Sequence, residues 1–214
     1  PQHADSTRTT TIERVRELAD GRRISVIPPF YGEDHYVSLL LGHIRRHLPS
    51  DADHLLLSYH GLPERHIKKA DPTGSHCLVE PECCSSPSVA HATCYRYQCY
   101  ETSRLIASQI DVPHSVSFQS RLGRLPWLTP YTDERITTLA AEGTRHLAIA
   151  CPAFVADNLE TLEEIAIRGR ESFIDAGGEE LTLIPGLNAS PDWAALIAAW
   201  ASSPGDHFQD LQSF

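Results

Sequence analysis

Apolar and polar positions along the chain alternate between a period typical of strands and a period typical of helices. Short apolar runs predict four strands, at residues 55–59, 115–119, 146–150 and 181–184. Apolar residues at helical spacing predict helices between them, near residues 95–110, 133–141 and 157–176. Because strands that alternate with helices indicate βαβ units, we expect the α/β class, with a four-stranded parallel sheet flanked by helices.

Further elements are predicted on either side of this repeat. Helical spacing predicts helices near residues 12–18, 34–48 and 192–201, and a β-branched run predicts a strand at residues 24–27. A polar break, Pro49-Ser50-Asp51, separates the helix at 34–48 from the first strand of the sheet. This break is the predicted domain boundary.

Three predicted strands run directly into segments with chemically active side chains. These segments are residues 58–63, 118–121 and 151–164, which carry a histidine, a Gln-Ser-Arg corner and several carboxylates. In an open α/β sheet, ligands bind in the crevice beyond the carboxyl ends of the strands. The sequence therefore predicts one cleft lined by all three segments.

The net charge, the apolar runs and the first residue of the chain limit which kinds of protein this can be. The net charge of −10 argues against a nucleic-acid partner bound through a broad basic face. No apolar run approaches the roughly 20 residues that span a bilayer. The chain contains no Met and begins with Pro1, so we expect a processed or truncated piece of a longer protein.

His60 and a set of acidic residues are the candidates for proton and metal chemistry. An imidazole at a cleft edge can take a proton from a weak acid, although a loop histidine bonded to backbone is the common alternative. Asp157, Glu160 and Glu164 share a helical face on which like charges repel, which favours a bound cation or proton. Asp157 and Glu160 also fit an Asp-x-x-Glu helix cap, an interpretation that leaves Glu164 unexplained.

A tryptophan and an arginine near the second strand end are candidates for ligand binding. Trp127 lies in a proline-containing loop, where an indole forms either a wall for a flat apolar ligand or ordinary packing. Arg121, with Ser120 beside it, matches the geometry of a ligand carboxylate.

Five of the six cysteines crowd into one short segment. Cys77, Cys83, Cys84, Cys94 and Cys99 follow the spacing Cys-x5-Cys-Cys-x9-Cys-x4-Cys, and Cys151 stands alone. Such clustering indicates a local metal site or local disulfides and not a chain-wide disulfide framework.

Four motifs in this order resemble the ferrochelatases. They are Ser58-Tyr59-His60-Gly61-Leu62-Pro63, then Phe118-Gln119-Ser120-Arg121-Leu122-Gly123, then Pro126-Trp127-Leu128-x-Pro130-x-Thr132, and finally Pro152-x-Phe154-x-x-Asp157-x-Leu159-Glu160-Thr161. The resemblance runs from residue 1 to about Trp200. It implies two Rossmann-like lobes around a porphyrin cleft and the insertion of Fe²⁺ into protoporphyrin IX, the last step of haem biosynthesis.

The resemblance also implies roles for individual residues. The catalytic histidine of the family falls on His60 and its active-site glutamate on Glu160. The acidic path for Fe²⁺ falls on Asp157 and Glu164, and the porphyrin pocket on Trp127, Gln119, Ser120 and Arg121. Asn158 stands where some members carry a histidine, which argues against a role for that histidine in metal entry here.

Members of the family are normally much longer than this chain. The resemblance therefore implies that residues 1–50 end a first lobe, that 51–190 form the second lobe, and that 191–214 form a C-terminal helix and tail. Most of the first lobe would be absent, so we expect about half an active site.

Residues 72–94 form an insertion that the simplest family members lack. A [2Fe–2S] cluster needs four thiolates, and some bacterial ferrochelatases carry one in this lobe. We expect Cys77, Cys94 and Cys99 as ligands with either Cys83 or Cys84, since adjacent residues rarely both bind one small cluster. A zinc site that recruits His76 or His91, or local disulfides, are the alternatives.

Two other functions stay open at this point. One is a chelatase for another tetrapyrrole or metal, such as coproporphyrin, or cobalt with sirohydrochlorin. The other is a non-catalytic tetrapyrrole or iron–sulfur sensor. For the favoured function the partners are a porphyrin and ferrous iron, the location is the cytoplasm, and a peripheral membrane contact is left open.

Overall fold

Four parallel strands form the centre of the computed structural model, which describes residues 1–22, 24–203 and 209–210. The strands are β2 (His54–His60), β3 (His114–Gln119), β4 (His146–Ala150) and β5 (Glu180–Leu183), in the order β3-β2-β4-β5. The α/β class and the four-stranded parallel sheet predicted from the sequence are confirmed.

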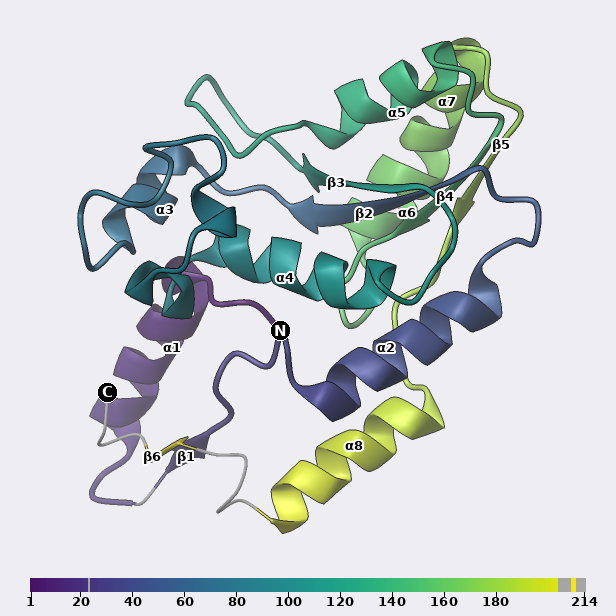
Figure 1. The fold of residues 1–214 in the computed structure, drawn as a ribbon. Coiled ribbons are helices and arrows are strands. Elements are labelled where there is room, and N and C mark those ends of the chain that lie inside the picture. The colour runs from purple at the N-terminus through teal and green to yellow at the C-terminus, as the bar shows by residue number, and fades with distance from the viewer. Residues whose placement is uncertain (23, 204–208, 211–214) are drawn as a thin grey trace.

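Helices cover both faces of the sheet, with α2 and α4 on one side and α5 and α7 on the other (Figure 1). The first layer contains α2 (Asp34–His47) and α4 (Tyr95–Ala107), and α8 (Pro191–Ser202) packs against α2. The second contains α5 (Thr132–Ala141) and α7 (Arg170–Asp175). The strand period divides the core: Leu55 and Leu57 of β2 face the first layer, and Leu56 faces the second.

Residues outside this sandwich form short elements. They are α1 (Asp5–Leu18), β1 (Ser25–Val26), α3 (Glu64–Lys69), the 3₁₀ turns η1 (Cys83–Ser85) and η2 (Val89–Ala92), and β6 (Gln209–Asp210). The strand predicted at 24–27 is only two residues long and pairs antiparallel with β6, outside the main sheet. Helix α3 was not predicted, because six residues are too few to show a helical period.

The single helix predicted at 157–176 is three segments: α6 (Leu159–Leu162), the π-helix η3 (Glu164–Gly169) and α7. The Asp-x-x-Glu cap is wrong. Asn158 caps α6 by accepting from the Thr161 N–H, while the Thr161 hydroxyl accepts from the Asn158 N–H. The predicted glycine end is confirmed, since Gly177 follows α7 with a φ of +102°.

Two observations bear on chain organisation. Helix α2 shares a hydrophobic core with β2 and α4, and the domain division at residue 50 stays a prediction.

Within residues 1–22 and 24–203, no helix has the length and apolar character needed to cross a membrane.

Gly178→Ala is expected to destabilise the fold by about 1–3 kcal/mol, because it overpacks a closed core. A Cβ at this position would clash with the ring of Phe173, which is fully buried. The matched control is Gly42→Ala in α2, where a Cβ meets no atom within 4 Å. Removing a helix-interior glycine there is expected to stabilise the protein by about 0.5–1 kcal/mol. Urea unfolding, monitored by circular dichroism, measures the free energy of unfolding of both variants. If this free energy is the same for Gly178→Ala as for the parent, the packing of Gly178 against Phe173 is contradicted.

Candidate active site

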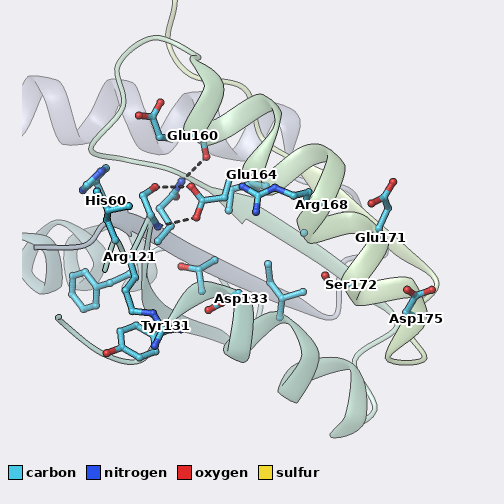
Figure 2. A pocket seen from close by; sticks show the side chains of 18 residues that line it. His60, Arg121, Tyr131, Asp133, Glu160, Glu164, Arg168, Glu171, Ser172 and Asp175 are labelled. Carbon is cyan, nitrogen blue, oxygen red and sulfur yellow. Dashed lines mark hydrogen bonds between the residues drawn. The ribbon is translucent and has the colours of Figure 1, made fainter. Parts of the chain in front are cut away.

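A cavity of about 800 Å³ opens beyond the carboxyl ends of β2 and β3, between α5 and the broken helix α6–η3–α7. Six of the residues singled out in the sequence line it together: His60, Gln119, Ser120, Arg121, Glu160 and Glu164. His60 and Glu160 lie at one end of the cavity, and Glu171 and Asp175 lie at the other (Figure 2). Trp127 and Asp157 do not line it.

Hydrogen bonds fix His60 in position. Its Nδ1 lies 2.6 Å from the carbonyl oxygen of Gly61, which can only accept, so Nδ1 carries the proton of the neutral ring. Nε2 is then the nitrogen with the free lone pair. The Tyr95 hydroxyl donates to the His60 carbonyl at 2.8 Å, and the Gly61 N–H donates to the Gln119 carbonyl at 2.7 Å. A neutral His60 is therefore oriented to accept a proton.

Glycine is required next to this histidine. A Cβ on Gly61 would lie 3.0 Å from the Gln119 carbonyl oxygen and 3.2 Å from the Trp127 ring. The rings of Trp127 and Phe154 lie 6.3 and 6.2 Å from the His60 ring, between centroids. Trp127 thus packs beside His60 even though it lies outside the cavity wall.

Gln119 is buried, and its side-chain amide forms hydrogen bonds with other parts of the protein. Its Oε1 accepts from the Ser58 hydroxyl at 2.7 Å, and its Nε2 donates to the Glu160 carbonyl at 2.5 Å. The amide therefore ties the end of β3 to β2 and to α6. In this arrangement it orients neighbouring groups and offers little to a ligand.

Ser120 and Glu164 form a two-point polar contact in the cavity wall. The Ser120 N–H and hydroxyl donate to the two carboxylate oxygens of Glu164 at 2.8 and 2.6 Å. Ser120 has a φ of +65°, a left-handed conformation that is unfavourable for a residue with a side chain. The paired hydrogen bonds offset that cost and hold the strand end against η3.

Glu160 and Asp157 differ in what their carboxylates contact. Within the described part of the chain, the Glu160 carboxylate makes no hydrogen bond or ion pair, and it lies at the His60 end of the cavity (Figure 2). Asp157 accepts from the Gly186 N–H and from the Asn188 and Thr161 side chains, at 2.7 to 3.1 Å. Asp157 therefore fastens the loop after β5, and Glu160 is the acid available to a ligand.

Several cavity residues were missed from the sequence. They are Tyr131, Asp133, Ile136, Ile165, Arg168, Gly169, Glu171, Ser172 and Asp175; three further lining residues, Phe118, Leu122 and Thr132, belong to the quoted motifs. Arg168, Glu171 and Asp175 continue the helical spacing that begins at Glu164. This spacing is the sequence signal that could have identified them as cavity residues. Tyr131 lies under Arg121, whose guanidinium carbon is 4.1 Å from the ring centroid.

The clustered cysteines form a second polar group, away from this cavity. Cys94 is the N-cap of α4, where its sulfur accepts from the Tyr97 N–H at 3.4 Å. The thiols of Cys84 and Cys77 hydrogen-bond with Cys94, and the Leu78 N–H donates to the sulfur of Cys83 at 3.4 Å. The bond from Cys84, acting against burial, lowers the pKa of Cys94 to about 6. Burial raises the pKa of Cys77 to about 12.

Cys99 has a hydrogen-bond partner outside this group of thiols. Its fully buried thiol hydrogen-bonds with the Tyr95 hydroxyl. All six cysteines are free thiols. Among the described residues, no set of three or more His, Cys, Asp or Glu side chains is arranged to hold a single metal ion.

Two histidines of the insertion bury unsatisfied nitrogens. Nε2 of His76 and Nε2 of His91 have no hydrogen-bond partner among the residues that the structure describes. The His91 ring stacks on Tyr97 at 3.6 Å and bonds to the backbone of Cys83, so it lies beside the thiols. Buried nitrogens of this kind indicate that the region accommodates a polar group.

Comparison with solved structures shows a known architecture. SirB from Bacillus subtilis with Fe³⁺ superposes with a TM-score of 0.58 over 94% of this chain and 67% of that one, at 13% identity. At that identity the likeness establishes the fold alone.

Sequence comparisons establish the family. The Ferrochelatase family model matches residues 1–203. A ferrochelatase from Pseudomonas fluorescens (strain Pf0-1) is 52% identical over 206 residues, 92% of this chain and 60% of the relative. One from Azotobacter vinelandii is 48% identical over 213 residues, 96% of this chain and 63% of the relative. The chain thus spans about three fifths of the length of these relatives, and it belongs to the ferrochelatase family.

Proposed function

We propose that the protein of which this chain is part inserts Fe²⁺ into protoporphyrin IX to make protohaem, as the last step of haem biosynthesis. The observation that carries the proposal is the pairing of His60 with Glu160 at one end of the cavity. Nδ1 of His60 is held by a carbonyl, and the Glu160 carboxylate is unpaired among the described residues. Membership of the ferrochelatase family supports the same reaction.

The reaction requires a base at the porphyrin and an acid that meets the metal. Two pyrrole N–H protons must leave as the ion enters, and Nε2 of a neutral His60 accepts one of them. Glu160, with hard carboxylate oxygens, either hands over the ferrous ion or relays a proton. Glu171 and Asp175 extend the acidic lining to the far end of the cavity and provide a route for the ion.

Glu164 and Asp157 have supporting roles in this proposal. Both oxygens of Glu164 accept from Ser120, and the Asp157 carboxylate accepts from the loop at residues 186–188. Carboxylates so occupied hold the site together and are poor ligands for a passing ion. In this proposal the acidic path for Fe²⁺ therefore consists of Glu160, Glu171 and Asp175, and the Asp157 and Glu164 carboxylates are not part of it.

Porphyrin binding is assigned to the rim of the cavity. Arg121 is exposed and carries donors suited to a propionate. Leu122 and Leu159 are exposed by 78% and 77% and supply an apolar surface for the macrocycle. Apolar walls that hold the ring bent would turn its nitrogens toward the metal, so that binding energy is spent on distortion. Trp127 supports this wall through its packing beside His60.

We further propose a [2Fe–2S] cluster in the cysteine insertion. The hydrogen bonds that join Cys77 and Cys84 to Cys94, and the contact of Arg96 Nη1 with the sulfurs of both Cys83 and Cys84, favour Cys77, Cys83, Cys84 and Cys94 as ligands. This assignment departs from the expectation drawn from the sequence, in which Cys99 is a ligand and only one of the adjacent Cys83 and Cys84 binds the cluster. Cys99, bonded to Tyr95, is the spare thiol in this assignment. The unsatisfied nitrogens of His76 and His91 suit a polar cluster. A bound cluster would cross-link the insertion to α4, and metal insertion itself transfers no electron.

A cytoplasmic location with a peripheral membrane contact is part of the proposal. Its support is the exposure of apolar side chains along α6 and η3, where Leu159, Leu162 and Ile167 have 77%, 51% and 55% of their surface exposed.

His60→Ala in the full-length protein is expected to lower kcat/KM for Fe²⁺ insertion into protoporphyrin by about 10²–10⁴, the range for loss of a general base. His114→Ala, at the exposed start of β3, is the control and should retain activity. Insertion only into coproporphyrin, or only of cobalt into sirohydrochlorin, would replace the substrate assignment. No insertion into any porphyrin by the parent protein would favour the sensor.

Glu160→Ala and Glu164→Ala are expected to separate chemistry from support. Glu160→Ala should leave the free energy of unfolding within about 0.5 kcal/mol of the parent, yet lower insertion by about 10²-fold or more. Glu164→Ala should cost about 1–3 kcal/mol of stability, because Ser120 loses the acceptor of two hydrogen bonds. Urea unfolding and the insertion assay measure the two effects. Equal loss of stability in both variants would contradict this division of roles.

Cys84→Ser and Cys94→Ser are expected to remove bound iron, whereas Cys99→Ser should retain about two irons and two sulfides per chain. Iron and sulfide analysis with visible spectroscopy of anaerobically purified protein decides this. A colourless parent that binds zinc would reject the cluster and leave the chelatase proposal standing. Iron lost from Cys99→Ser but kept in Cys84→Ser would restore Cys99 as a ligand.

A further inference from the structure

The cysteine insertion lacks a positive charge of its own. Residues 72–94 contain four cysteines and the acids Glu80 and Glu82, but no Lys or Arg. Thiolates packed in a partly buried space repel one another unless a cation or hydrogen-bond donors compensate them. A Lys or Arg side chain that compensates them must therefore come from outside the insertion.

Arg96, in the first turn of α4, makes this contact. Its Nη1 donates to the sulfurs of Cys83 and Cys84 at 3.5 and 3.4 Å, and its Nη2 donates to the Pro81 carbonyl at 3.1 Å. The guanidinium carbon lies 5.0 Å from the centroid of the Tyr100 ring. The guanidinium is thus held by the loop at one edge and by an aromatic ring on one face.

The start of α4 adds to the same positive environment. Cys94 caps the helix, and its sulfur accepts from the Tyr97 N–H. Helix N-termini carry a partial positive charge that favours nearby anions. Arg96 and this helix end therefore act on sulfurs of the same group, Arg96 on Cys83 and Cys84 and the helix on Cys94.

We propose that Arg96, through the N–H that it shares between Cys83 and Cys84, raises the reduction potential of the iron–sulfur cluster in the insertion. The inference rests on the cluster proposed above. On reduction, one electron from the titrant converts one ferric ion to ferrous, and the negative charge of the thiolate-bound site grows by one. A cation bonded to two ligand sulfurs stabilises the reduced form more than the oxidised form, since hydrogen bonds to sulfur and local charge set the potentials of such clusters.

A purely structural role for Arg96 is the competing explanation. The bond to Pro81 ties the loop to α4, and its loss could loosen the insertion without touching the electronics of the cluster. The side chain also borders a cavity of about 880 Å³, which Arg104 lines as well. Arg104 pairs with Glu101 at 2.6 Å and is the matched control, because it carries the same charge on the same helix and its ion pair is with a carboxylate.

The test is an anaerobic redox titration of the full-length protein, followed by visible and electron paramagnetic resonance spectroscopy. Arg96→Gln is expected to shift the ratio of reduced to oxidised cluster about tenfold toward oxidised at a fixed ambient potential, or about 59 mV for one electron. Arg96→Lys keeps the charge but not the guanidinium, whose Nη1 contacts both sulfurs while Nη2 bonds to Pro81, so its potential should fall between those of Arg96→Gln and the parent. Arg104→Gln should titrate like the parent.

Each remaining outcome decides the proposal. Equal potentials in the parent, Arg96→Gln and Arg104→Gln, with the cluster present in all three, would overturn the role of Arg96 and leave the cluster intact. If Arg96→Gln holds no iron, the reduction potential of Arg96→Lys decides. A potential lower than that of the parent protein supports the proposal, and a potential equal to that of the parent overturns it. A parent protein that takes up no iron and sulfide would instead reject the cluster, and the role of Arg96 would fall with it.

Discussion

The candidate site depends on a clamp between the end of β3 and the broken helix that follows β4. Ser120 gives both of its donors to Glu164, and Gln119 reaches the Glu160 carbonyl, so the last residue of β3 and the residue after it hold two turns of the helix. The clamp tolerates a left-handed serine because a charge-assisted pair of hydrogen bonds outweighs the backbone cost. With the carbonyl of Glu160 fixed in this way, its carboxylate lies at the His60 end of the cavity with no partner among the residues that the structure describes.

Helix α4 joins the two polar centres of the molecule. Its N-cap is Cys94, and the next residue, Tyr95, donates to the His60 carbonyl. The residue before His60 in β2 is Tyr59, and its hydroxyl forms a hydrogen bond of 2.8 Å with Ser103 on the same helix. The last two residues of β2 are therefore fastened to the helix on which the cysteine insertion packs. The position of His60 follows that of α4.

The sequence predicted much of the fold because burial has a simple period. All four strands came from apolar runs such as Leu55-Leu56-Leu57, and the strand-end rule placed His60, Arg121 and Glu160 at one cavity. The strand-end rule could not predict the internal hydrogen bonds of Gln119, Glu164 and Asp157. The composition of a motif does not reveal whether a side chain faces a ligand or the rest of the protein. Asp157 is occupied by Gly186 and Asn188, which lie far along the chain. Likewise, no local pattern distinguishes Cys99 from Cys94, whose surroundings differ only after folding.

The π-helix at Glu164–Gly169 has a consequence for how this segment tolerates length changes. A π turn accommodates about one more residue than an α turn, so it absorbs one residue without changing the orientation of the helix that follows. Deleting a single residue there and restoring a regular α-helix would therefore keep α7 facing as it does, whereas winding the same residues as an α-helix without a deletion would rotate α7 by about 100° about its axis, given 3.6 residues per turn. In that rotated helix Phe173 would leave the core, and Glu171 and Asp175 would turn away from the cavity. The π turn thus sets the orientation in which one helix contributes to the hydrophobic core and to the acidic wall at once.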